Sequence, residues 1–237
     1  MIKEELNMNV MEAIESRHSV RGFLDKQIDQ ETLMKVMKAA TCTPTWACTR
    51  PQQYFIAAGD VLKRIREQYV ELYTSGAPRN NDIPTEPTWP AREMENQLAW
   101  GRQRCKVQWN IDPNSTDPEE QARFDVIKKN MRLNAMKFFD APAVIFPCMD
   151  KGVHTWGLYD MGAASMNIML AAHEAGLGCI TAYHMGCYPE VLRKELGVPE
   201  NLNILLGIAI GYKDEESVEN KDKAVRTPVE EIVTIVK

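Results

Sequence analysis

Short apolar runs alternate with longer segments of helical periodicity in the second half of this 237-residue chain, and this alternation constrains the fold most. The run at 143–149 predicts a strand, the segment 157–176 predicts the longest helix, and 179–182 predicts the next strand. A short helix over 189–196 and a strand over 203–211 follow. Because the order is not a strict strand–helix–strand repeat, we expect an α+β fold packed in layers.

The first half shows the same two patterns. Apolar residues predict a short helix ending before Arg17, a second helix that Asp29 caps, a strand over 53–58, and a helix that starts near Gly59. From 75 to 121 six prolines break the chain, although 91–109 has helical spacing. We interpret 75–121 as an insertion, which forms either a lid or a surface excursion with its own small apolar cluster.

Two further segments complete the expected elements. A helix is predicted around 124–139, before the strand at 143–149. After a charged stretch, Ile232, Val233 and Val236 predict a terminal strand that docks elsewhere, for instance on a partner chain. Gly176-Leu177-Gly178 lacks the third glycine and the strand–turn–helix order of a dinucleotide fingerprint, so we interpret it as a helix end and exit.

Composition excludes several classes of function. A net charge of −5 argues against a dedicated nucleic-acid binder. Apolar runs such as 204–210 are too short to cross a bilayer, and residues 1–9 do not resemble a signal peptide, so we expect a cytoplasmic protein. Six cysteines form no CxxC pair and four histidines stand apart, so we expect free thiols and no metal site. No serine or cysteine lies in a nucleophile motif.

The segment 17–23 gathers unusual polar chemistry. Arg17, His18, Ser19 and Arg21 place two guanidiniums, an imidazole and a hydroxyl within five residues. Arginine forks match phosphate or carboxylate oxygens, and serine adds a neutral donor. The segment is therefore either an ordinary basic surface turn or part of a site for a phosphorylated cofactor. A chain without an evident nucleophile, metal or acid–base pair often leaves its chemistry to such a cofactor.

Several motifs, in one order along the chain, are similar to those of the FMN-dependent nitroreductase family, which includes flavin reductases and, more distantly, iodotyrosine deiodinase-like dehalogenases. They are Arg17-His18-Ser19-Val20-Arg21, the stretch from Asn134-Ala135-Met136-Lys137 to Ala141-Pro142, Tyr159-Asp160-Met161-Gly162-Ala163-Ala164 with Asn167, Gly176-Leu177-Gly178, the stretch 180–184, and Arg226-Thr227-Pro228. The resemblance covers most of the chain outside 75–121.

The resemblance implies a role for each motif. It assigns the FMN phosphate to Arg17, His18, Ser19 and Arg226, and the pyrimidine edge of the flavin to Arg21. Positive charge from Arg21 or Lys137 near that edge would favour reduced flavin. The remaining expected flavin contacts are Asn134, Lys137, Thr181, Ala182, Tyr183 and His184. We expect no catalytic side chain, because FMN carries the chemistry.

One loop departs from the family pattern. Residues 44–52 read Pro-Thr-Trp-Ala-Cys-Thr-Arg-Pro-Gln, where the family commonly has Pro-Ser-x-x-Asn-x-Gln-Pro-Trp and contributes to the flavin site of the partner subunit. Pro44 and Thr45 keep the pattern, since threonine replaces the serine hydroxyl. Cys48, Arg50 and Gln52 are substitutions, so substrate preference does not transfer from the family.

The resemblance also implies a fold and an assembly. We expect one domain over 1–237 with a three-layer α-β-α arrangement, a mostly antiparallel central sheet, and helices on both faces. We further expect a homodimer with a C-terminal strand exchanged between subunits, in which small residues at 162–164 let two helices approach closely.

The function that follows is an NAD(P)H-dependent FMN oxidoreductase that reduces nitroaromatics, quinones or similar small electron-poor acceptors by a ping-pong mechanism. Three alternatives stay open at this point. They are a flavin-dependent reductive dehalogenase, a flavin-binding protein without turnover, and an α+β interaction protein that binds no flavin.

Overall fold

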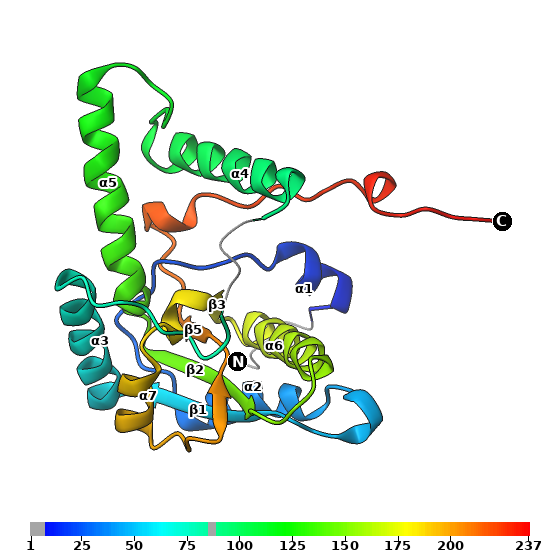
Figure 1. Cartoon of the computed structure of the whole chain (residues 1–237). Helices are drawn as coiled ribbons and strands as arrows, with labels where there is room; N and C mark the ends of the chain where they lie inside the picture. The colour runs from blue at the N-terminus through cyan, green and yellow to red at the C-terminus, as the bar shows by residue number, and fades with distance from the viewer. Residues whose placement is uncertain (1–7, 85–88) are drawn as a thin grey trace, which may run out of the picture.

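The computed structural model describes residues 8–84 and 89–237, so the first seven residues and Pro87 of the insertion lie outside it. A five-stranded sheet forms its centre, with the order β1-β2-β5-β3 and β4 paired to β2 (Figure 1). Every pairing between these strands is antiparallel. The strands are β1 (Gln53–Ala58), β2 (Ala143–Asp150), β3 (Gly178–Ala182), β4 (Leu202–Ile204) and β5 (Gly207–Gly211).

Helices pack on both faces of this sheet. The helices are α1 (Val10–Ser16), α2 (Gln30–Thr41), α3 (Gly59–Thr74), α4 (Ala91–Trp109), α5 (Pro118–Met136), α6 (Trp156–Glu174) and α7 (Pro189–Leu196). Alternate residues of β2 point to opposite faces. Val144 and Phe146 join a core with residues of α3, α5 and α7, whereas Ala143 and Ile145 join a core with residues of α2 and α6. The predicted layered α+β fold with an antiparallel sheet is confirmed.

Several predicted elements have different bounds. The segment 157–176, predicted as the longest helix, is α6, which has 19 residues like α4 and α5. The helix expected at 124–139 begins at Pro118, because the Asp117 side chain caps it, and ends at Met136, because the backbone turns left-handed from Phe138 to Asp140. The strand expected at 203–211 forms two strands. β4 pairs with one end of β2 and β5 with the other, and Pro147, which has no N–H to donate, lies between the two pairings.

The C-terminal arm, defined as residues 227–237, projects away from the body of the chain (Figure 1). It holds one turn of 3-10 helix, η5 (Val229–Glu231), and the terminal strand expected around Ile232–Val236 does not form within this chain. Its four apolar residues beyond η5 are exposed: Ile232, Val233, Ile235 and Val236. A strand needs an edge to pair with, and the extended arm reaches no edge of its own sheet.

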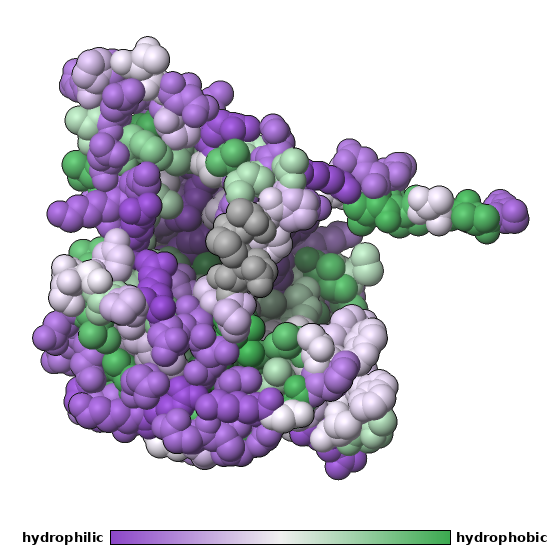
Figure 2. All heavy atoms as spheres, viewed as in Figure 1, coloured by the Kyte–Doolittle hydropathy of each residue, from purple (hydrophilic) through white to green (hydrophobic). Residues whose placement is uncertain are grey.

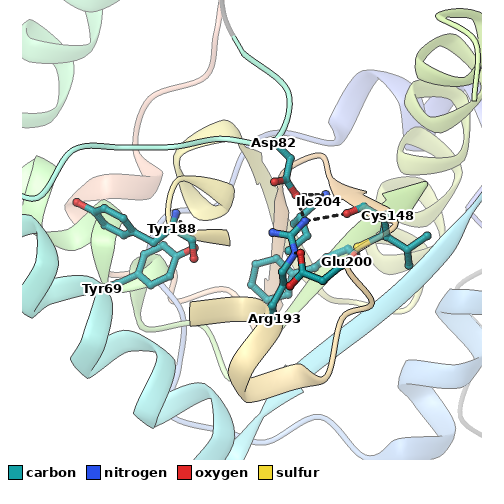
Figure 3. Close-up of polar contacts among 9 residues, drawn as sticks. Tyr69, Asp82, Cys148, Tyr188, Arg193, Glu200 and Ile204 are labelled. Carbon is teal, nitrogen blue, oxygen red and sulfur yellow. Dashed lines mark hydrogen bonds and ion pairs between the residues drawn. The ribbon is translucent and has the colours of Figure 1, made fainter. Parts of the chain in front are cut away.

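The predicted helix 91–109 is confirmed as α4, and it packs on a short 3-10 helix near the C-terminus, η4 (Val218–Asn220). The first part of the insertion is anchored by Asp82. Its Oδ2 accepts hydrogen bonds from Arg193 Nη2 and from the Ile204 backbone N–H, both at 2.8 Å (Figure 3). Arg193 is buried, so this ion pair fixes the base of the insertion against α7 and β4. None of the helices described is long and apolar enough to cross a membrane.

Candidate cofactor site

The edge strand β3 positions the N-terminal basic motif. Ser19 forms a parallel β-bridge with Cys179, and the Val20 backbone N–H donates to the Cys179 carbonyl at 3.1 Å. Gly178 permits this close approach, because a Cβ there would lie less than 3.0 Å from the side chain of Val20. The motif therefore lies beside the first residues of β3. Gly176, at φ +73°, ends α6 as the sequence predicts.

Two polar atoms of this motif are buried without a hydrogen-bond partner among the described residues: Arg17 Nε and His18 Nε2. His18 Nδ1 donates to the Ser16 carbonyl at 3.2 Å, so its Nε2 can donate only when the imidazole is protonated. A buried polar atom left without a partner is costly. Arg17 Nε and a protonated His18 Nε2 therefore mark a place where an external anion fits.

Positive charge accumulates around the same place. Burial lowers the pKa of His18, and the charges of Lys213 and Lys223 lower it further. The pKa of His173 is lowered by burial and then by Arg17, Lys213 and Lys223. His173 Nε2 lies 2.7 Å from Ser16 Oγ, so α6 contributes to the site. An anion such as a phosphate dianion would favour the protonated imidazoles and satisfy the orphaned atoms.

The far end of β3 meets the end of α5. His184 follows β3 in the 3-10 helix η3 (Tyr183–Gly186), and its Nε2 donates to the Ala135 carbonyl at 2.8 Å. Burial lowers the pKa of His184 to about 4, so its ring is neutral at pH 7. This contact places His184 beside the end of α5, where Asn134 and Lys137 lie.

The turn after Lys137 is held by a residue that the sequence analysis missed. Phe138, Phe139 and Asp140 all have φ between 53° and 57°, a left-handed conformation that costs energy for residues other than glycine. Arg66 of α3 donates from Nε to the Lys137 carbonyl at 2.7 Å, and its Nη2 donates to the Ala141 carbonyl. Arg66 lies in an ordinary amphipathic helix, so its spacing gave no signal for this role.

Arg21 is held by the C-terminal region. Its backbone N–H donates to Asn220 Oδ1 at 2.7 Å, and Asn220 Nδ2 donates to the Gly22 carbonyl at 2.8 Å. Its guanidinium carbon lies 5.6 Å from the ring centroid of Trp100 in α4. Asn220 and Trp100 were not predicted as site residues, because one lies in a charged tail and the other in the insertion.

The loop with Pro44 and Thr45 lies apart from these residues. Buried Asp160 accepts a hydrogen bond from the Trp46 N–H at 3.0 Å, which fixes the loop near the start of α6, whereas His173 lies near the end of α6. Thr43, which precedes Pro44, accepts a hydrogen bond from Asn167 Nδ2 at 2.8 Å, so the loop lies along the first two thirds of α6. Among the described residues Pro44 and Thr45 form no hydrogen bond with the other predicted site residues, and their expected contribution across a dimer stays a prediction.

Arg226 is also not brought to the motif. It is exposed, and within the described part of the chain it forms no hydrogen bond or ion pair. Lys223, three residues earlier, is near enough for its charge to lower the pKa of His18 and of His173. In the segment that contains both residues, it is therefore the charge of Lys223 that acts on the site.

Other chemistries find no support at this place. Burial raises the pKa of Cys179, which lies against Ser19, to about 12, so it is not a thiolate at pH 7. All six cysteines are free thiols, and among the described residues no group of three metal-ligating side chains comes together. A cavity of about 470 Å³ lies elsewhere, at the end of α4, and no predicted site residue lines it.

The chain matches known proteins over most of its length. The sequence profile of the nitroreductase family matches residues 14–212. The nitrobenzene nitroreductase of Ectopseudomonas oleovorans is 27% identical over 94% of this chain and 95% of its own. The chloronitrobenzene nitroreductase of Comamonas testosteroni is 26% identical over the same shares.

Solved structures agree on the fold. The FMN-dependent nitroreductase NfnB from Mycobacterium smegmatis, in complex with NADPH, superposes with a TM-score of 0.83 at 23% identity, covering 96% of this chain and 97% of that one. The FMN- and NADPH-dependent NfnB of a Sphingopyxis strain gives 0.86 at 20% identity, covering 97% and 99%.

Proposed function

Because the chain belongs to the nitroreductase family, we propose that it is an FMN-dependent oxidoreductase that uses NAD(P)H to reduce nitroaromatics, quinones or similar small electron-poor acceptors. The observation that carries this proposal is the pair of buried, unpartnered atoms Arg17 Nε and His18 Nε2 within a cluster of positive charge. They fit the phosphate of FMN. Two relatives named as nitroreductases of nitrobenzene and chloronitrobenzene support the acceptor class.

We propose that residues near the two ends of β3 bind different parts of FMN. Arg17, His18 and Ser19 would hold the phosphate beside the start of the strand, with Lys223 and Arg226 closing over it from the tail. Thr181, Ala182, Tyr183 and His184 would pass the flavin ring, and Asn134 and Lys137 would contact it from α5. Arg21 would face the pyrimidine edge.

When bound, FMN supplies the redox chemistry, so no side chain needs to act as an essential acid or base. Nucleotide and acceptor can then use one slot in alternation, which implies ping-pong turnover. Buried Phe139 and neutral His184, whose ring centroids lie 5.8 Å apart, would form an apolar wall of this slot near α5. A neutral His184 adds no charge that would compete with Arg21 or Lys137.

We also propose that two copies build the site as a homodimer. The exposed apolar residues of the C-terminal arm need a covering surface, and Trp46, Trp156 and Tyr159 are exposed at the start of α6. A second copy would bring its Pro44–Thr45 loop to the flavin. Gly162 faces open space, which suits close contact between two α6 helices.

The domain organisation is part of the same proposal: one domain spans 1–237, and the insertion at 75–121 forms a lid over the site. Figure 2 shows that the face of the molecule is hollowed between the α4–α5 region and the body beneath it. We propose a cytoplasmic location, which suits six free thiols.

An anaerobic titration of the purified protein tests the function. We expect released FMN after denaturation, bleaching of the bound flavin by NADPH or NADH, and reoxidation by nitrobenzene or a quinone. Bleaching with one nucleotide alone would settle which one the enzyme uses. If flavin binds but neither nucleotide bleaches it, the proposed NAD(P)H-dependent activity is contradicted. Release of halide from a halophenol would favour the alternative function of a reductive dehalogenase.

A further inference from the structure

A partly buried charge cluster joins the insertion to the N-terminal motif. The guanidinium carbons of Arg21 and Arg104 lie 5.6 Å and 5.7 Å from the centroid of the same indole ring, that of Trp100. Arg104 is buried, although it belongs to a helix whose other side is exposed. A cation within about 6 Å of a tryptophan ring is attracted to it. Trp100 therefore holds two cations near each other.

Arg104 is balanced by one carboxylate. Its Nη2 lies 2.5 Å from Glu219 Oε2, and its Nε donates to Gln108 Oε1 at 2.9 Å. Glu219 lies in η4, next to Asn220, which holds the backbone of Arg21. Asp222 is also buried, with Oδ1 accepting from Gln103 Nε2 at 3.2 Å. The cluster thus places Arg21 between α4 and η4.

The charges of this cluster act on Arg21. The pKa of Arg21 is lowered to about 10, chiefly by burial and then by the positive charge of Arg104, while Glu219 and Asp222 oppose that change. The electrostatic interaction between two charges is only weakly screened when both are shielded from solvent. A change of charge at Arg104 or Glu219 is therefore felt at Arg21 and at any group that Arg21 contacts.

We propose that Arg104 and Glu219 set the reduction potential of the bound FMN, acting on its pyrimidine edge through Arg21 and Trp100. The inference rests on the proposed function, because the resemblance assigns that edge to Arg21. Reduction adds negative charge to the flavin, so positive charge near the edge stabilises the reduced form. The insertion would then be both a cover and a source of redox tuning, with Arg104 and Glu219 as positioning residues.

The proposal predicts shifts of opposite sign. Arg104→Gln removes a positive charge and leaves Glu219 unbalanced, so it lowers the potential. Glu219→Gln leaves Arg104 unbalanced and raises it. We expect each shift to correspond to a roughly tenfold change in the ratio of affinities for reduced and oxidised FMN, which is about 30 mV for a two-electron couple. Loosened packing alone would weaken binding in both variants without opposite shifts.

The experiment measures the midpoint potential of FMN bound to the full-length protein, together with the dissociation constant of oxidised FMN. Arg102→Gln is the matched control, because it makes the same charge change in the same helix, at an exposed side chain that points to Glu95. We expect it to leave the potential unchanged. Arg104→Lys keeps the charge and should keep the potential even where binding weakens.

The outcomes separate the two proposals. If the wild-type protein binds no FMN, the proposed function fails. If it binds FMN and is reduced by NAD(P)H, but Arg104→Gln and Glu219→Gln shift the potential in the same direction or leave it unchanged, the inference fails and the function stands. If Arg104→Gln does not fold, a comparison of the single variants Glu219→Gln and Arg104→Lys still tests the inference. Only Glu219→Gln should raise the potential.

Discussion

The imidazole of His184 links the end of β3 to the end of α5, and burial makes its protonation unfavourable. In the unfolded chain this group titrates near 6.5, whereas the folded pKa is about 4. Between these values the unfolded state binds a proton that the folded state does not. The stability that neutral His184 contributes is complete above pH 6.5 and falls as the pH drops toward 4, by about 3 kcal/mol at pH 4.

We therefore expect His184→Gln to change how stability depends on pH. The glutamine amide can donate to the Ala135 carbonyl from a similar position but takes up no proton. Urea unfolding at pH 7 and at pH 4.5 checks this. The wild-type protein should lose more stability than the variant over this interval, and equal losses in both would contradict a buried neutral His184.

A second residue-scale prediction concerns Ala47 in the Pro44–Gln52 loop. Its φ of 48° is left-handed, a conformation that costs an alanine roughly 1–2 kcal/mol and costs glycine little. Ala47→Gly should raise the free energy of unfolding by up to about 1 kcal/mol, since the gain is offset by the greater entropy of the unfolded glycine. Ala39→Gly, in the interior of α2, should instead lower it by about 1 kcal/mol. Chemical denaturation of both variants decides, and a loss at Ala47 would contradict the left-handed loop.

At the scale of elements, Arg66 joins α3 to the turn that ends α5. Arg66→Met keeps the aliphatic packing but leaves the Lys137 and Ala141 carbonyls without their donor. We expect a loss of about 2–3 kcal/mol of stability, because buried groups lose hydrogen bonds to a charged partner. FMN affinity should fall as well, because the turn orients Asn134 and Lys137.

The matched control is Arg64→Met in the same helix. Arg64 is half-exposed and pairs with Glu195, whose carboxylate keeps the hydrogen bond from Gln68 Nε2, so we expect its loss to cost less than about 1 kcal/mol. Thermal unfolding and FMN titration of both variants test the assignment. Equal effects at Arg64 and Arg66 would show that the turn does not depend on Arg66.

Elements whose ends are set by residues within or next to them were predictable from the sequence. The helix α4 has the predicted bounds because Pro90 and the left-handed Asn110 limit it, and α7 ends at Gly197 as expected. The end of α5 was not predictable, because the left-handed turn at Phe138 depends on Arg66, which is distant in sequence. The split between β4 and β5 likewise depends on Pro147 in another strand.

The candidate site follows the same rule. The grouping of Arg17, His18 and Ser19 is visible in the sequence because the residues are consecutive. The contacts of Arg21 are not visible, since Trp100 and Asn220 come from two distant segments. The meeting of His184 with Ala135 depends on where β3 and α5 end in the sheet. The resemblance of motifs grouped Arg21 and His184 where local patterns could not, but it did not include Trp100 or Asn220.

At the scale of the whole molecule, the C-terminal arm is the feature that one chain leaves unexplained. Its apolar side chains are exposed along an extended segment that reaches beyond the body (Figure 2). Exposed apolar segments of this kind mark protein–protein contacts. If the arm locks two copies together, adding charge to its apolar positions should separate them.

The double variant Val233→Asp with Ile235→Asp tests this lock, and Thr234→Asp, between them, is the control that adds a like charge at a polar position. We expect the wild-type protein and the control to sediment at twice the mass of the chain. The double variant should sediment closer to the mass of one chain. It should also lose FMN, because the dissociated partner no longer supplies its Pro44–Thr45 loop. Burying a carboxylate in an apolar interface is strongly unfavourable, which predicts the direction. A wild-type monomer that retains FMN would contradict the shared site, and a double variant that stays dimeric would place the lock elsewhere, on α6.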